Sequence, residues 1–236
     1  MSNSSELAVQ PAPGAATRTA SVRASVPSKP RRSQTERSEE TQLRLVEAAV
    51  KILRKKGYAG LRSAEVSRVA KVSRGGQLHH FPSKDDLVAA TAEHMLKLSL
   101  DRGRVHAREA MEADDVLEAI IRDSMDFFFG EDFKVILDLV MTGGKNRKIR
   151  DQVYGHAKES RQPVEAAWIE VLVARGLPRV DAEKVLWITV SIVRGLAIRA
   201  FWQDDETLFR SVLDGWKDIV AKQFGKKLKP IQGETS

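Results

Sequence analysis

From about residue 38 onward, the hydrophobic positions recur every three to four residues, which is the spacing of one face of a helix. In the first such segment Val46, Ala49, Val50 and Leu53 mark the apolar face, and Gly57 closes the segment. We find no stretch with the two-residue alternation of a strand, and no internal repeat. The pattern therefore predicts an all-α chain.

Two short helices joined by a tight turn are expected after the first one. Ser63 is placed to cap the second helix, and Ser73 to cap a third helix over residues 74–81. Ser83 then caps a fourth helix that runs to about residue 108. A supporting helix followed by two short helices and a tight turn predicts a helix-turn-helix unit.

Five more helices are expected beyond this unit, because glycine, proline and aspartate positions mark their ends. Their expected ranges are 114–129, 131–141, 146–174, 179–202 and 204–224. The chain is thus divided into four parts. They are a disordered tail (1–33), a helix-turn-helix domain (34–88), a second helical domain (89–225) and a disordered C-terminal tail (226–236).

The excess of basic residues lies in the N-terminal third. Residues 31–84 carry 13 Lys and Arg against 5 Asp and Glu, whereas residues 85–236 carry 23 against 26. The whole chain has a net charge of +7. This asymmetry indicates a module that binds a polyanion, attached to a nearly neutral one. On charge alone, a solvated basic face without a partner is the alternative.

The sequence offers no positive sign of catalysis, of a metal site or of a cofactor. Cysteine is absent, which excludes disulfides, thiolate nucleophiles and cysteine-ligated zinc. The adjacent His79 and His80 point roughly 100° apart on a helix and cannot share a metal. The segment T-G-G-K at 142–145 lacks the first glycine of a phosphate-binding loop. No apolar run reaches the roughly 18 residues of a membrane span. We expect a cytoplasmic protein that is not an enzyme and does not associate with membranes.

The segment V-S-R-G-G-Q-L-H-H-F, residues 72–81, places two glycines side by side in a helix, where each costs roughly 1 kcal/mol relative to alanine. In a helix-turn-helix the second helix enters the major groove of DNA. Side chains at its start would hold the backbone away from the DNA, so Gly75 and Gly76 favour close approach. A loop in which the glycines supply a turn is the alternative. Leu78 and Phe81, however, have the spacing of a buried helix face.

Residues 57–87, G-Y-A-G-L-R-S-A-E-V-S-R-V-A-K-V-S-R-G-G-Q-L-H-H-F-P-S-K-D-D-L, resemble the DNA-binding domain of tetracycline-repressor (TetR) family regulators. The family pattern V-S-x-G-x-L-Y-x-H-F is matched at unshifted spacing. The resemblance implies phosphate contacts from Ser63, His80 and Lys84, and an arginine at 74 that suits guanine. Together with the helix positions, it leads us to expect nine DNA-contacting residues: Ser63, Ser73, Arg74, Gly75, Gly76, Gln77, His79, His80 and Lys84.

Two departures from the family pattern affect this expectation. Lys71 stands where the family turn has glycine, so either a lysine adopts the turn geometry or the turn is different. Gln77 and Leu78 replace the usual Leu-Tyr pair. We expect Leu78 to take over the packing, with a slight rotation of the helix that turns Gln77 towards the groove.

The resemblance also implies a helical regulatory domain that dimerises through its last two helices and binds a small effector among the middle ones. The helix 179–202 is apolar around much of its circumference, which favours a partner, although a purely intramolecular core is the alternative. The expected interface residues are Trp187, Val190, Arg194, Ala197, Ile198, Phe201, Val212 and Trp216. The expected effector contacts, for which core packing is the alternative role, are Arg122, Met125, Phe128, Phe129, Met141, Tyr154 and Trp168.

These observations together predict a homodimeric, effector-responsive transcription factor, more often a repressor than an activator, that binds a palindromic operator in double-stranded DNA. Effector binding would shift the fourth helix and so change the spacing of the two recognition helices. Two other function classes stay open at this point. One is a sequence-tolerant architectural DNA-binding protein without an effector, and the other is an all-α enzyme.

Overall fold

The computed structural model describes residues 33–142 and 147–225, and within these ranges every regular element is a helix. The all-α prediction is therefore confirmed. The helices are α1 (Gln34–Gly60), α2 (Ser63–Ala70), α3 (Arg74–His80), α4 (Lys84–Glu109), α5 (Val116–Phe128), α6 (Glu131–Thr142), α7 (Arg147–Ala174), α8 (Arg179–Arg199) and α9 (Glu206–Phe224). In the described ranges no helix combines the length and hydropathy that crossing a bilayer requires.

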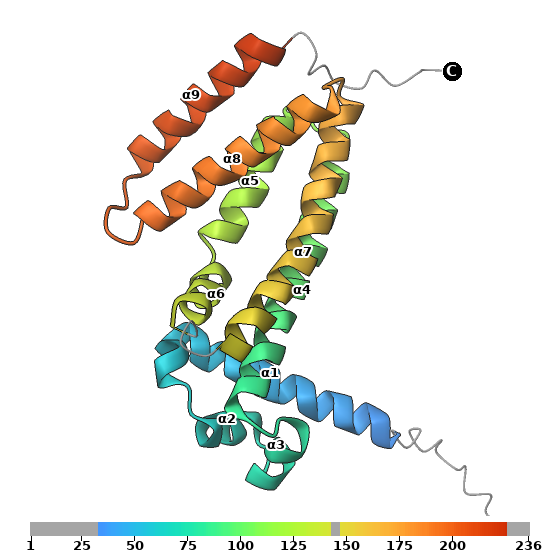
Figure 1. Ribbon diagram of the computed structural model, residues 1–236, viewed down its shortest axis with the longest axis vertical. Coiled ribbons are helices and arrows are strands. Elements are labelled where there is room, and N and C mark those ends of the chain that lie inside the picture. Colours follow the sequence, from blue (N-terminus) through green and yellow to red (C-terminus); the bar gives the residue numbers. More distant parts are fainter. Residues whose placement is uncertain (1–32, 143–146, 226–236) are drawn as a thin grey trace, which may run out of the picture.

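The helices are arranged along one long axis. Figure 1 shows α1, α2 and α3 together at one end of the molecule, and α8 and α9 towards the other end. The long helices α4 and α7 pack side by side between them. The end with α1 to α3 is thereby connected to the rest of the molecule mainly through α4, α6 and α7.

Two hydrophobic clusters form the core. The first combines α1, α2 and the first half of α4 with residues of α6 and α7, and the second joins the end of α4 to α5, α7, α8 and α9. Leu87 and Leu96 of α4 lie in the first cluster, and Ala107 of the same helix lies in the second. Packing therefore continues past residue 88, where the sequence divides the two expected domains.

The first helix begins earlier than the hydrophobic pattern predicts. Ser33 is its N-cap: the Ser33 hydroxyl accepts a hydrogen bond from the Glu36 N–H at 3.1 Å, and the Ser33 N–H donates to the Glu36 carboxylate at 2.7 Å. This capping box starts a first turn that is polar all round, so no apolar spacing marks it. Ser33 thus belongs to α1 and not to the tail, while residues 1–32 and 226–236 of the two predicted tails lie outside the described ranges.

Gly57 ends the regular part of α1 with a positive φ of 64°, as expected for a glycine at a helix end. One further turn of chain follows as far as Gly60. The start of α2 differs from the prediction: Ser63 does not cap the helix but is its first residue, and the N-cap is Arg62, which makes no side-chain capping bond. The extended backbone of Arg62 presents its carbonyl to the N–H groups of Glu65 and Val66, at 3.0 and 3.1 Å.

The turn between α2 and α3 is closed by Lys71. Its backbone is left-handed, with φ 56° and ψ 43°, and its N–H donates to the carbonyls of Ser67 and Arg68. Of the two possibilities left open by the sequence, the lysine adopts the turn geometry. Ser73 then caps α3 by accepting a hydrogen bond from the Gly76 N–H at 3.1 Å, as predicted.

Gln77 is buried under α3. The expectation that Leu78 would take over the packing, and that Gln77 would turn towards the groove, is therefore wrong. The Gln77 side chain is 2% exposed, and the Ser67 hydroxyl of α2 donates to its amide oxygen at 2.5 Å. Leu78 is instead 46% exposed. The hydroxyl at 67 gives the buried amide a partner, so a polar side chain can occupy a position between α2 and α3 where an apolar one is usual.

We predict that Ser67→Ala lowers the free energy of unfolding by about 1–3 kcal/mol, because it leaves a buried amide without its hydrogen-bond donor. Adding Gln77→Leu to that variant removes the unsatisfied group and should recover most of the loss. Urea unfolding followed by circular dichroism measures both. If the double variant is no more stable than Ser67→Ala, this bond is not what holds α3 against α2.

Candidate nucleic-acid interface

The outer face of α3 is formed by the residues of this helix that are open to solvent. Arg74, Gly75 and His79 are exposed on this face, together with Leu78. Gln77 is 2% exposed and Phe81 is 3% exposed. Because both side chains are buried, they fix the rotation of this short helix about its axis. The helix therefore presents one polar, glycine-containing surface to solvent.

The two adjacent glycines of α3 have different surroundings. A Cβ built at Gly75 would meet no atom within 4 Å, so this position opens to the outside. A Cβ at Gly76 would lie 3.1 Å from a methyl group of Val72 and 3.2 Å from the Ser73 hydroxyl. From the sequence, both glycines were expected to allow close approach to DNA. The structure separates them: only Gly75 clears the outer face, whereas Gly76 makes room for the helix cap.

The polar groups around this face come from the start of α2 and of α4 as well as from α3. Ser63 and His80 are half-buried, and Ser73 is exposed. The His79 and His80 rings meet edge to face, with centroids 5.4 Å apart. Eight of the nine residues expected to contact DNA thus belong to neighbouring positions of α2, α3 and α4 with some exposed surface, while Gln77 does not reach the surface.

Lys84, at the start of α4, is held more firmly than a surface lysine. Its ammonium donates to the Tyr58 carbonyl at 3.1 Å and lies 4.1 Å from the centroid of the Tyr58 ring. Burial and the neighbouring guanidinium of Arg62 lower the pKa of Lys84 from its ordinary value. The lysine therefore provides a positive charge of defined position at the edge of the α3 surface.

The backbone of Tyr58 connects three helices. Its N–H donates to the carboxylate of Asp138 in α6 at 2.7 Å, and its carbonyl accepts from Lys84 of α4. Beside it, Arg54 of α1 pairs with Asp132 of α6 at 2.5 Å. These bonds tie the end of α1 to the rest of the molecule. Sequence patterns did not single out Asp132 or Asp138, because nothing local distinguishes them from solvated acids.

An aromatic group lies between α5 and α6 in the middle of the molecule. The rings of Phe127, Phe128 and Phe133 are in mutual contact, with centroids 4.9 to 5.8 Å apart. The guanidinium of Arg161 lies 4.8 Å from the centre of the Phe127 ring, and burial lowers the pKa of this arginine. Its nearest acid is Glu165, at 4.0 Å, whose pKa burial raises.

Trp168 joins this region through a polar chain. Its indole N–H donates to Asp123 at 3.0 Å, and the other oxygen of Asp123 lies 2.8 Å from His106 Nδ1. Asp123 is 7% exposed and Trp168 is 2% exposed, so the chain crosses the packed layer between α4, α5 and α7. Trp168 was expected from the sequence as a candidate, but Asp123 and His106 were not, because both are far from it along the chain.

The residues expected to contact an effector lie at different depths. Phe128 and Trp168 are in the core, and Met125 and Phe129 are half-buried. Met141 and Tyr154 are exposed, by 74% and 52%. The remaining residue, Arg122, is also exposed and lines a hollow of about 170 Å³ together with His106 and Asp123.

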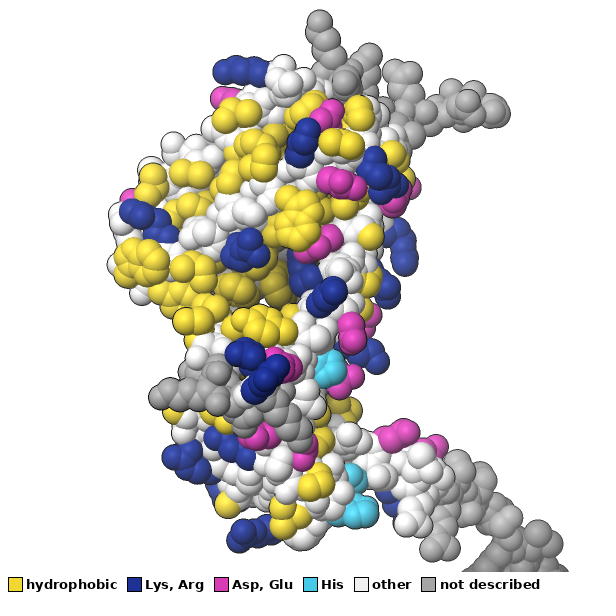
Figure 2. Space-filling model, viewed as in Figure 1, with side chains coloured by type: hydrophobic (Ala, Val, Ile, Leu, Met, Phe, Trp, Pro, Cys, Tyr) yellow, Lys and Arg dark blue, Asp and Glu magenta, His cyan; other side chains and the backbone are white. Residues whose placement is uncertain are grey.

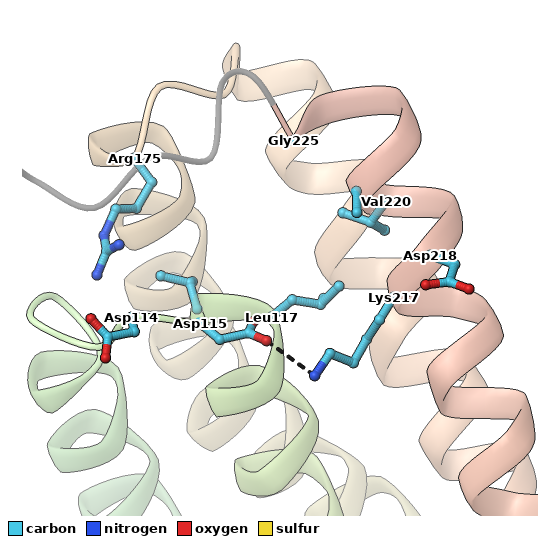
Figure 3. A pocket seen from close by; sticks show the side chains of 10 residues that line it. Asp114, Asp115, Leu117, Arg175, Lys217, Asp218, Val220 and Gly225 are labelled. Atoms are coloured by element: carbon cyan, nitrogen blue, oxygen red, sulfur yellow. Dashed lines mark ion pairs between the residues drawn. The ribbon is translucent and has the colours of Figure 1, made fainter.

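A larger cavity of about 380 Å³ lies at the other end of the molecule from α3, where α5, α7 and α9 meet. Figure 3 shows Lys217 of α9 pointing across it to Asp115, at 3.0 Å, and Glu118 accepts from the same ammonium at 2.8 Å. Burial acts to raise the pKa of Asp115, but the hydrogen bonds from the Glu118 N–H and from Lys217 outweigh burial, so the pKa lies below its ordinary value. The Arg175 guanidinium donates to carbonyls at the end of α4. The two ion pairs of Lys217 connect α9 to the start of α5.

Hydrophobic side chains are exposed along α8, α9 and the connection between them. Figure 2 shows hydrophobic side chains gathered on this part of the molecule. The large exposed ones are Val180, Trp187, Ile188, Phe201, Trp202, Val212 and Ile219. Monomeric proteins rarely expose a large contiguous apolar surface.

The residues expected at a dimer interface divide into two groups. Trp187, Arg194, Phe201 and Val212 are exposed, and Ile198 is half-buried. The others pack within the chain: Val190 and Ala197 are in the core, and Trp216 donates its indole N–H to Thr189.

Comparison with known proteins identifies relatives of this chain. Residues 45–91 match the family described as bacterial regulatory proteins, tetR family. The chain is 40% identical over 196 residues to the HTH-type transcriptional regulator CymR of Pseudomonas putida, covering 83% of this chain and 97% of that protein. It is 26% identical over 182 residues to an uncharacterized HTH-type transcriptional regulator of Mycobacterium tuberculosis, covering 77% and 88%.

Solved structures share the fold. A putative TetR-family regulator from Rhodococcus sp. superposes with a TM-score of 0.59 at 21% identity, covering 77% of this chain and 98% of that one. A putative regulator from Saccharomonospora viridis, in complex with choline, has a TM-score of 0.58 at 20% identity, covering 77% and 96%. The similarity thus extends over both the α1–α3 end and the long helices.

Proposed function

Because the chain belongs to the TetR family of bacterial regulatory proteins, we propose that it is an effector-responsive repressor that binds a palindromic DNA operator as a homodimer. Its place among transcriptional regulators, and not among enzymes, follows from the family. The observation that carries the proposal is the outer face of α3, where Arg74 and His79 flank an open Gly75. Since bacterial operators lie in the cytoplasm, the protein acts there.

In this proposal residues 34–88 form the DNA-binding domain, with α3 in the major groove. The guanidinium fork of Arg74 suits the O6 and N7 atoms of guanine, and Gly75 lets the helix backbone come close to the base edges. Ser63, His80 and Lys84 contact phosphates at the sides of the groove, and Ser73 and His79 complete the surface. The charge of residues 31–84, 13 basic against 5 acidic, supports this orientation.

The helical domain 89–225 provides dimerisation. The exposed aromatic and aliphatic side chains of α8 and α9 supply an apolar surface that a second copy of the chain would cover. Trp187 and Phe201 are its large aromatic members among the residues named from the sequence. Dimerisation serves DNA binding because two recognition helices must reach half-sites about 34–36 Å apart.

Release by an effector requires that the effector bind better to a conformation that does not fit DNA. The Tyr58 backbone supports a route for this change, since its N–H is bound by α6 and its carbonyl by α4. A shift of either helix displaces the end of α1 and with it the α2–α3 pair. The aromatic group around Phe128, with Arg161 beside it, is the region of the helical domain in which we place the effector contacts.

We predict that Arg74→Ala lowers affinity for the operator by about fivefold or more while changing affinity for random duplex much less, because a bidentate base contact carries about 1–3 kcal/mol of discrimination. Fluorescence anisotropy on both duplexes at fixed salt measures this. Arg104→Ala, which removes an exposed arginine of α4, is the matched control and should keep the preference. Equal losses on both duplexes would exclude Arg74 from base reading. A wild-type protein without any preferred site would instead indicate a sequence-tolerant DNA-binding protein.

The two glycines of α3 should respond differently to alanine. Gly75→Ala is expected to raise the free energy of unfolding by up to about 1 kcal/mol, because alanine favours the helix, and to weaken operator binding, because the new methyl faces the DNA. Gly76→Ala should bring no gain in stability, since its Cβ crowds Val72. Thermal unfolding and operator titration test the pair. Undiminished operator binding by Gly75→Ala contradicts the proposed close approach.

Trp187→Glu is expected to convert the dimer to a monomer and to weaken operator binding, because it buries a charge in an apolar interface. Light scattering after size-exclusion chromatography gives the mass. The control is Val105→Glu, at a comparably exposed position of α4, which should stay dimeric. A dimeric Trp187→Glu variant would place the interface elsewhere.

A further inference from the structure

Leu78 is an exposed aliphatic side chain on the outer face of α3. It is 46% exposed and belongs to neither hydrophobic cluster of the described residues. It faces outward because Gln77, bonded to Ser67, fills the place beneath the helix. Single exposed leucines are common on protein surfaces, so exposure alone has no meaning here. The position of Leu78 is what matters.

Leu78 lies one turn beyond the two residues at the centre of the proposed DNA surface. It follows Gly75 by three positions and Arg74 by four, and residues at these spacings are neighbours on a helix face. Apart from the helix's own backbone and the neighbouring residues, no atom lies within 4 Å of a Cβ built at Gly75, so α3 is open to solvent there. An aliphatic group therefore stands directly beside the arginine that faces the base edges.

A leucine can recognise only one feature of the major groove. It has no hydrogen-bond donor for phosphate oxygens or for the N7 and O6 acceptors of purines. Among the four bases only thymine carries an apolar group there, the methyl at C5. Contact between the two removes both from water, which stabilises the complex.

We propose that Leu78 reads the 5-methyl group of a thymine in each half-site, and so determines part of the operator sequence. This inference rests on the proposed function. A spacing of four residues spans about 6 Å along a helix, against about 3.4 Å between base pairs. The thymine therefore lies within about two base pairs of the guanine bound by Arg74, on either strand.

The first step of the test defines the operator. The purified full-length chain selects its preferred site from a pool of random duplex DNA, and we expect an invariant thymine within two base pairs of an invariant guanine in each half-site. A selected half-site without an invariant thymine at this distance overturns the inference. If no preferred sequence emerges at all, the proposed function itself fails.

The second step removes the methyl group alone. Each thymine of the selected operator is replaced by deoxyuridine, one position at a time in both half-sites, and affinity is measured by fluorescence anisotropy. At the thymine read by Leu78 we expect a loss of about fourfold for each half-site, the effect of one buried methyl-sized group. Unchanged affinity at every position, with specific binding retained, overturns the inference and leaves the proposed function standing.

The third step connects the methyl group to the residue. Leu78→Ala should lose affinity for the thymine operator and bind the thymine and uracil operators equally. Val69→Ala, which shortens an exposed side chain of α2, should keep the difference between them. If Leu78→Ala still distinguishes thymine from uracil, or weakens both operators by the same factor, Leu78 does not read the methyl group. Because Leu78 lies outside the core, circular dichroism should show an unchanged fold.

Discussion

The hydrogen bond between Ser67 and Gln77 determines the rotation of α3 about its own axis. This rotation decides which side chains of α3 are exposed on the proposed DNA-binding surface. The helix is short, from Arg74 to His80, so few contacts are available to hold it. Phe81 anchors its end and the buried amide anchors its middle. With both in place, Arg74, Gly75 and His79 point outward. A rotation of one residue, about 100° on a helix, would bury the open glycine face.

The connection between the two ends of the molecule depends on polar contacts at the end of α1. Hydrophobic packing alone tolerates small shifts of one helix over another, whereas a hydrogen bond has a narrow range of length and angle. The Tyr58 N–H donates a hydrogen bond to Asp138, and the Tyr58 carbonyl accepts one from Lys84. These two bonds fix the position of α2 and α3 relative to both α4 and α6. A shift of α4 or α6 would therefore also move α2 and α3, as the proposed release by an effector requires.

At the end of the molecule formed by α8 and α9, several large apolar side chains are exposed. There the charged groups Lys217, Asp115 and Glu118 bind one another around a cavity, while large apolar side chains of α8 and α9 remain exposed. Under the proposed function this apolar surface is the one that a second copy of the chain would cover. The proposed DNA-binding surface and the proposed dimer interface then lie at separate ends of the molecule, connected by α4 and α7.

Local sequence determined the helices, their capping by Ser73 and Ser83, and the helix-turn-helix with its family resemblance, because these depend on neighbours within a few residues. Of the α3 residues that it assigned to the outer face, Arg74 and Gly75 are exposed there, whereas Gly76 is half-buried. It failed where the deciding partner was distant. Whether Gln77 or Leu78 is buried depended on a hydroxyl ten residues away on another helix, and the roles of Asp123 and Asp138 depended on helices brought together only by folding. The two glycines look alike in sequence, yet only the packed structure shows that one is crowded by Val72 and the other faces open space. Burial and hydrogen-bond partnership are properties of the folded whole, which is why the tertiary structure, and not the local pattern, decided them.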